Sequence, residues 1–313
     1  MEKENDILFL FFNNPQNNNI FLEWFNRENG IRGECVFKPV GILCRIIRRF
    51  HLYSGLPGIG IWFYQWHKEI RPGKKIVCIA SKYSPRILKW IKKKEPSVML
   101  INYYWDSIAV SRYPVKEYPY YKNYTFCKKD SKQYAMLYNP QFYISSMKLP
   151  TNKLKYDISF IGSDREGVWE ERAILVNQYY QLLKQKGFHL FFYFVTKKQE
   201  CPEEIRKQKW LTEEEYYKVV AESRVVLEIV NPEEEWITLR PLLALSNGKK
   251  LISNNRSIVE EAYYSKENIF ILGLDKEQDL FGFINKPFTP IAEEILAYYD
   301  VQAWSKRFFT KRE

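Results

Sequence analysis

A strand–loop–helix–strand segment in the last third of the chain constrains the fold more than any other feature. The apolar run Arg224–Val230 is followed by the turn dipeptide Asn231-Pro232, an acidic loop and a helix-like segment, Thr238–Ser246. An Asn-Gly pair then ends the helix, and Lys250–Ser253 is typical of a second strand. Two strands joined in this way form a right-handed βαβ crossover in a parallel sheet, and ligands bind beyond the carboxyl ends of such strands. The loop 233–240 is therefore a candidate binding site.

Short apolar runs alternate with helix-like segments along the rest of the chain, which predicts the α/β class. The expected strands are 6–12, 34–37, 74–80, 98–104, 124–126, 157–162, 188–195, 224–230, 250–253 and 268–272. The expected helices are 18–28, 41–50, 84–94, one ending at 186, 213–222, 238–246, 258–264 and final helices within 290–309. A linker rich in Asn, Pro and Lys covers 139–155, so we expect two domains, 1–150 and 151–313.

The net charge of +11 is distributed unevenly between these two halves. Residues 1–150 carry +13 and residues 151–313 carry −2. A basic first half favours an anionic partner, either an anionic membrane surface, a lipid-diphosphate acceptor or nucleic acid. Its cations include Arg45, Arg48, Arg49 and the run Lys92–Lys94. No nucleic-acid motif accompanies them, so we expect no nucleic-acid partner; a solvated basic surface without a dedicated partner is the other interpretation.

Composition and the N-terminal segment predict a cytoplasmic protein. Hydrophobic residues make up 46% and charged residues 27%, as in folded soluble chains. No apolar run reaches the roughly 18 residues of a spanning helix, and the polar N-terminus leads directly into a strand instead of a signal peptide. The five cysteines have no paired short spacing, which fits a reducing compartment. The apolar segment 56–70 suits either a membrane-contacting loop or a core segment, and the core interpretation is favoured.

Two strand ends in the second half carry residues suited to phosphate. The strand 157–162 ends on Gly162-Ser163, where backbone N–H groups can approach an anion, and Arg165 follows. Thr238 and Arg240 follow the strand 224–230, and a guanidinium is a bidentate phosphate ligand. The alternative for Arg240 is a surface pair with the acidic run 233–235.

This second strand end also carries a family resemblance. Ile237-Thr238-Leu239-Arg240, then Ala244-Leu245 and Gly248–Ile252 before Asn255, resemble the C-terminal signature of GT-B glycosyltransferases. The similarity is greatest to the CgeB-like branch of bacterial capsule and lipopolysaccharide enzymes. It implies two Rossmann-like domains facing a cleft, an N-terminal acceptor domain and a C-terminal domain for a nucleotide-sugar donor. It also implies a last helix that crosses back to the first domain, and no cofactor other than the nucleotide-sugar substrate.

The chain departs from the Gly-Leu-Thr-x-Arg-x-x-Glu-Ala-Leu pattern of that branch at two positions. Trp236 replaces the glycine and Leu243 replaces the glutamate, which in related enzymes holds the ribose hydroxyls of the donor. Glu235, in the neighbouring acidic run, is the candidate to replace that contact. The resemblance places Gly162, Ser163, Arg165, Thr238, Arg240 and Asn255 with it in the donor site.

Candidates for the chemistry lie in the first half of the chain. Asp106 follows the strand 98–104, and an inverting sugar transfer requires a general base near the acceptor hydroxyl. A capping role at the start of a loop is the alternative for Asp106. Of the three histidines, His67 lies in the segment best suited to line a cleft. No Asp-x-Asp or metal-ligand spacing occurs, so no metal is implied.

Taken with the resemblance, these features favour a glycosyltransferase that moves a sugar from a nucleotide-sugar donor to a lipid-linked or polysaccharide acceptor. The protein would act in surface-glycan synthesis as a peripheral protein at the inner face of the membrane. Leu243 favours the alternative, a non-catalytic GT-B-like protein that binds a glycan or a partner.

Overall fold

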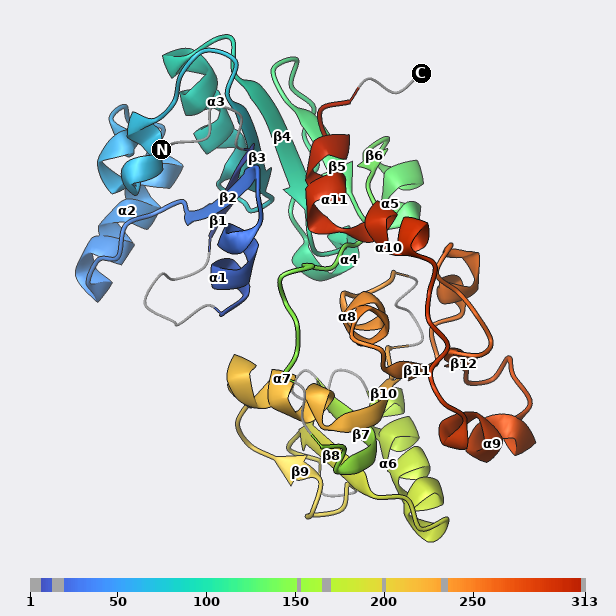
Figure 1. Ribbon diagram of the computed structural model, residues 1–313. Helices are drawn as coiled ribbons and strands as arrows, with labels where there is room; N and C mark the ends of the chain where they lie inside the picture. Colours follow the sequence, from blue (N-terminus) through green and yellow to red (C-terminus); the bar gives the residue numbers. More distant parts are fainter. Residues whose placement is uncertain are drawn as a thin grey trace. The chain divides into compact units, whose positions relative to one another are not determined.

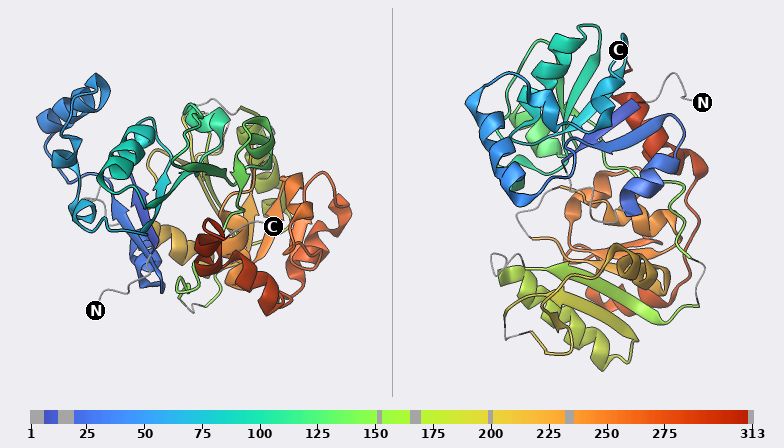
Figure 2. Two further views of the ribbon diagram at one scale, coloured as in Figure 1. Left: turned by 90° about the horizontal axis from the view of Figure 1, so that it is seen from above. Right: turned by 90° about the vertical axis from the view of Figure 1, so that its left-hand side faces the viewer.

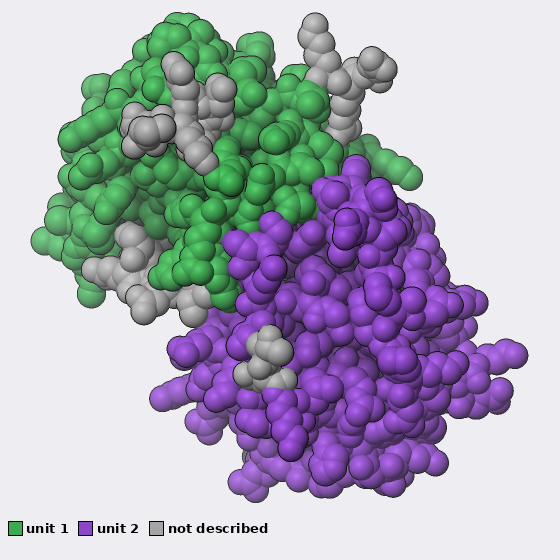
Figure 3. Space-filling view, viewed as in Figure 1, with its two compact units in different colours: residues 1–140, 300–313 green, residues 141–299 purple. Residues whose placement is uncertain are grey.

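The computed structural model describes residues 7–12, 20–150, 153–164, 170–198, 201–231 and 236–310. The chain divides into two compact units (Figure 3). Unit 1 comprises residues 1–140 and 300–313, and unit 2 comprises residues 141–299. Each unit is built around its own parallel six-stranded sheet with helices on both faces (Figures 1 and 2).

Unit 1 has the strand order β2-β1-β3-β4-β5-β6, and all neighbouring strands are parallel. Its strands are β1 (Ile7–Phe11), β2 (Ile31–Cys35), β3 (Lys75–Ile79), β4 (Met99–Tyr104), β5 (Lys122–Thr125) and β6 (Leu137–Tyr138). Its helices are α1 (Ile20–Arg27), α2 (Ile42–Ser54), α3 (Ser84–Lys94), α4 (Ile108–Ser111), α5 (Lys128–Gln133) and α11 (Val301–Arg307), with 3-10 turns η1 (Ile59–Trp62) and η2 (Gln65–Lys68). The order reverses between β1 and β3.

Both faces of the unit 1 sheet are buried, and β1 shows how its residues divide between them. Leu8 and Leu10 pack into a cluster with side chains from η1, η2 and α3. The intervening Phe9 and Phe11 point to the other face, where Phe25 of α1 contacts both rings. Burial on both faces explains why β1 is continuously apolar in sequence, as parallel strands commonly are.

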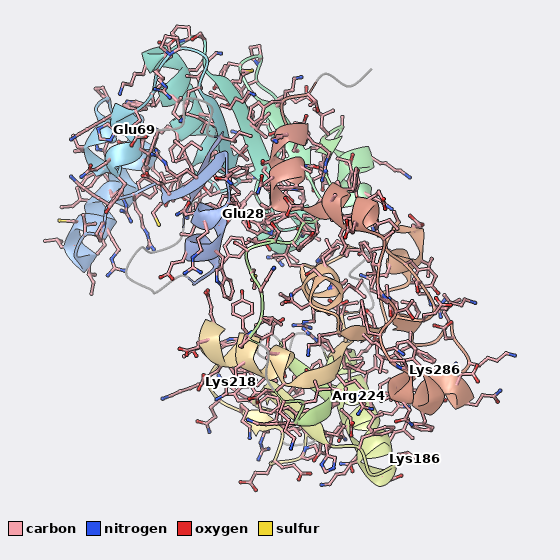
Figure 4. The ribbon with its side chains drawn as sticks, in the orientation of Figure 1. Glu28, Glu69, Lys186, Lys218, Arg224 and Lys286 are labelled. Atoms are coloured by element: carbon pink, nitrogen blue, oxygen red, sulfur yellow. The ribbon has the colours of Figure 1, made fainter. Side chains whose placement is uncertain are left out.

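Helix α11 completes the second face of unit 1, although it comes from the end of the described chain. Trp304 is fully buried and stacks on Phe9 at a centroid distance of 5.4 Å. The Asn139 Nδ2 donates to the Trp304 carbonyl, and the Arg307 Nε donates to Asn139 Oδ1. Gln302 donates to the Glu28 carboxylate, which lies just after α1 (Figure 4).

Unit 2 has the strand order β12-β11-β10-β7-β8-β9, again all parallel. Its strands are β7 (Tyr156–Ser163), β8 (Leu190–Val195), β9 (Arg206–Lys207), β10 (Ser223–Glu228), β11 (Lys250–Ser253) and β12 (Ile269–Ile271). Its helices are α6 (Glu170–Gln185), α7 (Glu213–Ala221), α8 (Arg240–Ser246), α9 (Leu280–Asn285) and α10 (Glu293–Tyr299), with 3-10 turns η3 (Arg256–Glu260) and η4 (Glu277–Asp279). This is the doubly wound Rossmann order, with its switch point between β7 and β10.

Helices α6 and α9 cover one face of this sheet, and α7 and α8 contribute to the other. Along β10, Val225 and Leu227 face the α6 side and Val226 faces the α8 side. The predicted α/β fold class with two Rossmann-like domains is therefore confirmed.

Several expectations about individual elements need correction. Strand β2 lies at Ile31–Cys35 instead of 34–37. Gly33 at its centre lets α1 approach, since a Cβ there would lie 2.8 Å from Leu22 Cδ2. The expected helix at 258–264 is the 3-10 turn η3, and the elements β6, β9, α4, α5 and α9 were not expected.

The segment 56–70 forms the two 3-10 turns, and its Ile59, Phe63 and Trp66 are buried in the core of unit 1. The core interpretation of this segment is therefore confirmed. Among the described residues, no helix combines the length and apolar character needed to cross a bilayer.

Candidate functional site

The carboxyl edge of the unit 2 sheet carries a buried polar network at its switch point. Glu228, the last residue of β10, is fully buried and accepts hydrogen bonds from Thr238 Oγ1 at 2.6 Å and Ser253 Oγ at 2.9 Å. Thr238 Oγ1 in turn accepts from the Arg240 backbone N–H. The loop before α8 is therefore fixed to the ends of β10 and β11. Sequence reasoning missed Glu228, although a lone glutamate in the run Val225–Val230 was a signal.

Two guanidinium groups lie at the end of β7. Arg240 Nη2 donates to the Ile161 carbonyl at 3.0 Å, which places Arg240 beside Gly162. Arg172 of α6 also lies against Gly162. A Cβ atom added to Gly162 would lie only 2.9 Å from Arg172 Nη2. Arg172 is 9% exposed. The structure thus joins the two predicted strand ends through Arg240, and adds Arg172, which the sequence did not single out.

A cavity of about 1010 Å³ opens at the carboxyl ends of β7, β8 and β9. Its lining includes Ser163, Thr196, three cations (Lys197, Arg206 and Lys207) and the exposed ring of Trp210. Asp164 and Glu203 are its acidic lining residues. Cations therefore outnumber carboxylates in the cavity, which favours an anionic ligand.

Asp164 is the most deeply buried of the polar groups that line the cavity. It is fully buried, and its Oδ2 accepts a hydrogen bond of 2.5 Å from Thr196 Oγ1. Within the described part of the chain, its Oδ1 meets no hydrogen-bond donor. A buried acceptor without a partner costs free energy unless a ligand or water supplies a donor. Asp164 is thus a carboxylate of the cavity lining that retains an unused acceptor oxygen.

The remaining predicted donor-site residues differ in their surroundings. Asn255 is buried, with its amide donating to the Trp236 carbonyl and its Oδ1 accepting from the Ser257 N–H, so it holds the loop in place. Leu243 is half-buried on α8. Arg165 and Glu235 lie outside the described residues.

The two predicted catalytic residues lie beside different strands of unit 1. Asp106 is exposed and follows β4, at the carboxyl edge. His67 lies in η2 next to Trp66, whose indole Nε1 donates to the Val36 carbonyl just after β2. The His67 carbonyl accepts a hydrogen bond from Lys94 Nζ of α3. The His67 ring Nδ1 lies 2.6 Å from the Tyr64 carbonyl. The structure does not bring Asp106 and His67 together.

A buried carboxylate that the sequence did not single out lies near Asp106. Asp130 is 5% exposed, and its Oδ2 accepts from the Ile108 backbone N–H at 2.8 Å. Burial raises the pKa of the Asp130 carboxyl. It anchors the start of α4, directly after the segment that carries Asp106. No cluster of three or more His, Cys, Asp or Glu side chains suited to a metal ion occurs in the described ranges.

Comparison with protein families and with curated proteins finds no match. Among solved structures, the S. aureus MnaA-UDP co-structure is 10% identical, with a TM-score of 0.48, over 96% of this chain and 94% of that chain. TarM is 8% identical, with a TM-score of 0.43, over 77% of this chain and 51% of that chain. A Glycosylation Associate Protein complex from Streptococcus agalactiae is 12% identical, with a TM-score of 0.40, over 85% and 54%. The functional assignment therefore rests on the residues of this chain.

Proposed function

We propose that the protein is a glycosyltransferase of the GT-B type that binds a nucleotide-sugar donor at the carboxyl edge of the unit 2 sheet. The observation that carries the proposal is the convergence of Arg240 and Arg172 on Gly162, beside a cavity lined by three further cations. A nucleoside diphosphate is an anion that guanidinium groups bind with paired hydrogen bonds. The switch point of a doubly wound sheet is also where such sheets bind ligands.

In this proposal each part of the site has a distinct role. The two arginines neutralise the diphosphate and stabilise it as the leaving group when the glycosidic bond of the donor breaks. Asp164 Oδ1 accepts a hydroxyl of the donor, and the exposed ring of Trp210 offers an aromatic face to the base or the sugar. Of the described residues we assign Asp164 to the contact that the family glutamate would make at Leu243, and Glu235 remains the candidate from the sequence.

We assign the general base to Asp106 in preference to His67. A base must approach the acceptor hydroxyl within hydrogen-bond reach, and the carboxyl edge of a parallel sheet is where ligands bind. Asp106 is exposed at that edge of unit 1, whereas the His67 ring Nδ1 already lies 2.6 Å from the Tyr64 carbonyl. The proposal includes no metal and no cofactor beyond the nucleotide-sugar substrate.

We further infer that the acceptor is a lipid-linked or growing glycan and that the protein works at the inner face of an anionic membrane. The excess charge of +13 in residues 1–150 supports this. Arg45 and Arg49 are exposed on α2. By contrast, Lys92 Nζ and Lys94 Nζ donate to the carbonyls of Val98 and His67, so the Lys92–Lys94 run is less available to a partner.

Isothermal titration with a panel of nucleoside diphosphates tests the donor site. Arg240→Ala should weaken binding by about 1.5–3 kcal/mol, the usual effect of losing a charge-assisted hydrogen bond. Arg224→Ala is the matched control, because Arg224 lies at the start of β10 and pairs with Asp157 at 3.5 Å (Figure 4). Equal affinities in the two variants, or no binding of any diphosphate by the native protein, would refute the assignment.

A second candidate function is a non-catalytic protein that binds a glycan or a partner. The observation that favours it is Leu243, which places an apolar side chain where the resemblance expects a hydroxyl-binding carboxylate. Hydrolysis of a nucleotide sugar by the native protein, abolished in Asp106→Asn, would exclude this candidate.

A further inference from the structure

Helix α2 carries an unusual amount of exposed apolar surface. Of its 13 residues, only Leu52 is buried. Six large apolar side chains are between 49 and 72% exposed: Ile42, Leu43, Ile46, Ile47, Phe50 and Tyr53. The helix lies at the periphery of unit 1 (Figures 1 and 2). A contiguous apolar patch on an otherwise charged surface marks an interaction site.

The apolar residues of α2 share one face, which points away from unit 1. At 100° per residue, the six side chains fall within an arc of about 140°. The opposite side carries Leu52, which packs into the core, and Arg48, whose guanidinium lies 4.4 Å from the centre of the Phe37 ring. These two contacts with unit 1 lie roughly opposite the middle of the apolar arc. Tyr53, near one margin of the arc, also packs against Tyr83 at 5.7 Å, and the rest of the arc faces outward.

Cations lie beside the apolar face instead of within it. On the same projection, Arg45 and Arg49 lie along one margin of the arc, and both are exposed. Lys82 is near the end of the helix, with its Nζ 5.4 Å from the centre of the Tyr53 ring. An apolar face bordered by basic residues matches the interface of an anionic membrane, where apolar side chains enter the acyl boundary and cations meet lipid phosphates.

The helix is also held firmly enough to present this face. Arg86 Nη1 and Nη2 donate to the carbonyls of Leu52 and Leu56, at and beyond the last turn. His51 contacts the Pro57 carbonyl through Nε2 and accepts from Trp62 Nε1. A rigid element needs no ordering when it binds, which reduces the entropy cost of association.

We propose that α2 is a membrane-insertion helix, whose apolar face enters an anionic lipid surface while Arg45 and Arg49 bind lipid phosphates. The proposal extends the membrane association inferred above from charge alone, by naming the element and adding an apolar contribution. It does not depend on the transferase chemistry, because its test contains no nucleotide and measures no sugar transfer.

Partition between buffer and vesicles of equal parts phosphatidylglycerol and phosphatidylcholine tests the proposal. Ile46→Ser/Phe50→Ser should lower the partition coefficient about tenfold or more, because a serine does not gain the free energy that an apolar side chain gains on leaving water. Arg45→Gln/Arg49→Gln should lower it severalfold at low salt and have little effect near 1 M salt, where charges are screened. Ile174→Ser/Leu274→Ser removes two equally exposed aliphatic side chains from unit 2 and should change nothing.

A fluorescent reporter distinguishes insertion from surface adsorption. Cys44 is the exposed cysteine of the five, so Phe50→Cys in a Cys44→Ser background accepts a single nitrobenzoxadiazole label. Its emission should shift to the blue and be quenched by bromine-labelled acyl chains, whereas a label at Ile174→Cys in the same background should not respond.

Either of two results would overturn the proposal. One is an unchanged partition coefficient in Ile46→Ser/Phe50→Ser. The other is a native dimer in light scattering that the same substitutions convert to monomer, which would make a second copy of the chain the occupant of this face.

Discussion

The two units share one plan but place different chemistry at the carboxyl edge of their sheets. In unit 1 this edge is aromatic: Trp105, after β4, lies 5.8 Å from Phe11 and 5.4 Å from Phe21 between ring centres. In unit 2 it is polar, with Glu228 binding two hydroxyls and Arg240 reaching the end of β7. The strands define the fold, whereas the residues at and beyond the end of each strand determine which ligand the edge suits.

The interiors of the two units differ in a related way. The second face of unit 1 is an aromatic cluster built around Phe9, Tyr103, Trp304 and Phe308. Unit 2 buries more charge within its sheet, including Glu228 and Lys250. The stability of unit 1 should therefore depend on packing, and that of unit 2 on hydrogen bonds and pH.

The largest effect is expected from the aromatic cluster of unit 1. Trp304→Ala should lower the free energy of unfolding by about 3–5 kcal/mol, because it removes a fully buried indole and leaves a cavity. Trp210→Ala, which alters a tryptophan that is 61% exposed in unit 2, should change it by less than about 0.5 kcal/mol. Urea unfolding of both variants measures the difference. Similar decreases in the free energy of unfolding of the two variants would show that the stability of unit 1 does not depend on its aromatic packing.

The second effect concerns pH and the buried lysine of unit 2. Lys250 Nζ donates to the carbonyls of Phe283 and Lys286 at the end of α9 (Figure 4), and burial lowers its pKa from 10.5 to about 8. Between pH 8 and 10.5 the unfolded state therefore binds more protons than the folded state. The free energy of unfolding should rise as the pH increases across this range. At 1.36 kcal/mol per pKa unit the gain is roughly 3 kcal/mol.

Lys250→Met isolates this contribution. The stability of the native protein relative to Lys250→Met, followed by urea unfolding, should stay constant below pH 8 and increase between pH 8 and 10.5. A difference that is flat across this window would show that Lys250 titrates normally in the folded protein.

The third effect tests the polar edge of unit 2. Glu228→Gln retains the shape of the side chain but leaves one carbonyl oxygen for two hydroxyl donors, Thr238 and Ser253. Stability should fall by about 1–3 kcal/mol, the cost of a buried polar group without its partner. Nucleotide binding should weaken as well, because Thr238 holds the loop that carries Arg240. Glu214→Gln, on the exposed side of α7, is the control and should leave both unchanged.

The smallest effect is expected at Leu243. If Asp164 or Glu235 already binds the donor hydroxyls, Leu243→Glu adds a second carboxylate, and nucleotide affinity should stay the same or decrease slightly. If the site is degenerate, the new acceptor should instead add about 1.5–3 kcal/mol to binding. Calorimetry on this one variant separates the active enzyme from the non-catalytic alternative, and a gain in affinity would count against our proposal.

Sequence reasoning located most strands because burial on both faces makes them continuous apolar runs, as in β1, β4 and β10. It misplaced β2, where Arg32 and Glu34 interrupt the apolar pattern. It also missed β9, whose two residues carry no periodicity.

The same limits apply to the site. The rule for parallel strands correctly brought Gly162 and Arg240 to one edge. The sequence did not predict the cavity. Thr196, Arg206 and Trp210 line it together only because of β9 and a loop that carries no recognised motif. Asp106 and His67 were each selected on chemistry alone, because neither belongs to a recognised catalytic motif.

The return of α11 to unit 1 has a consequence for the order in which the protein is made. Phe9 and Tyr103 leave the ribosome long before Trp304, the residue that covers them. Unit 2, residues 141–299, is continuous in the chain and can fold as it emerges. Phe25 of α1 can pack on Phe9 early, but the part of the aromatic face that Trp304 covers stays exposed while unit 2 is made. During synthesis this apolar face is thus exposed for longer than the core of unit 2, and exposed apolar surface favours aggregation.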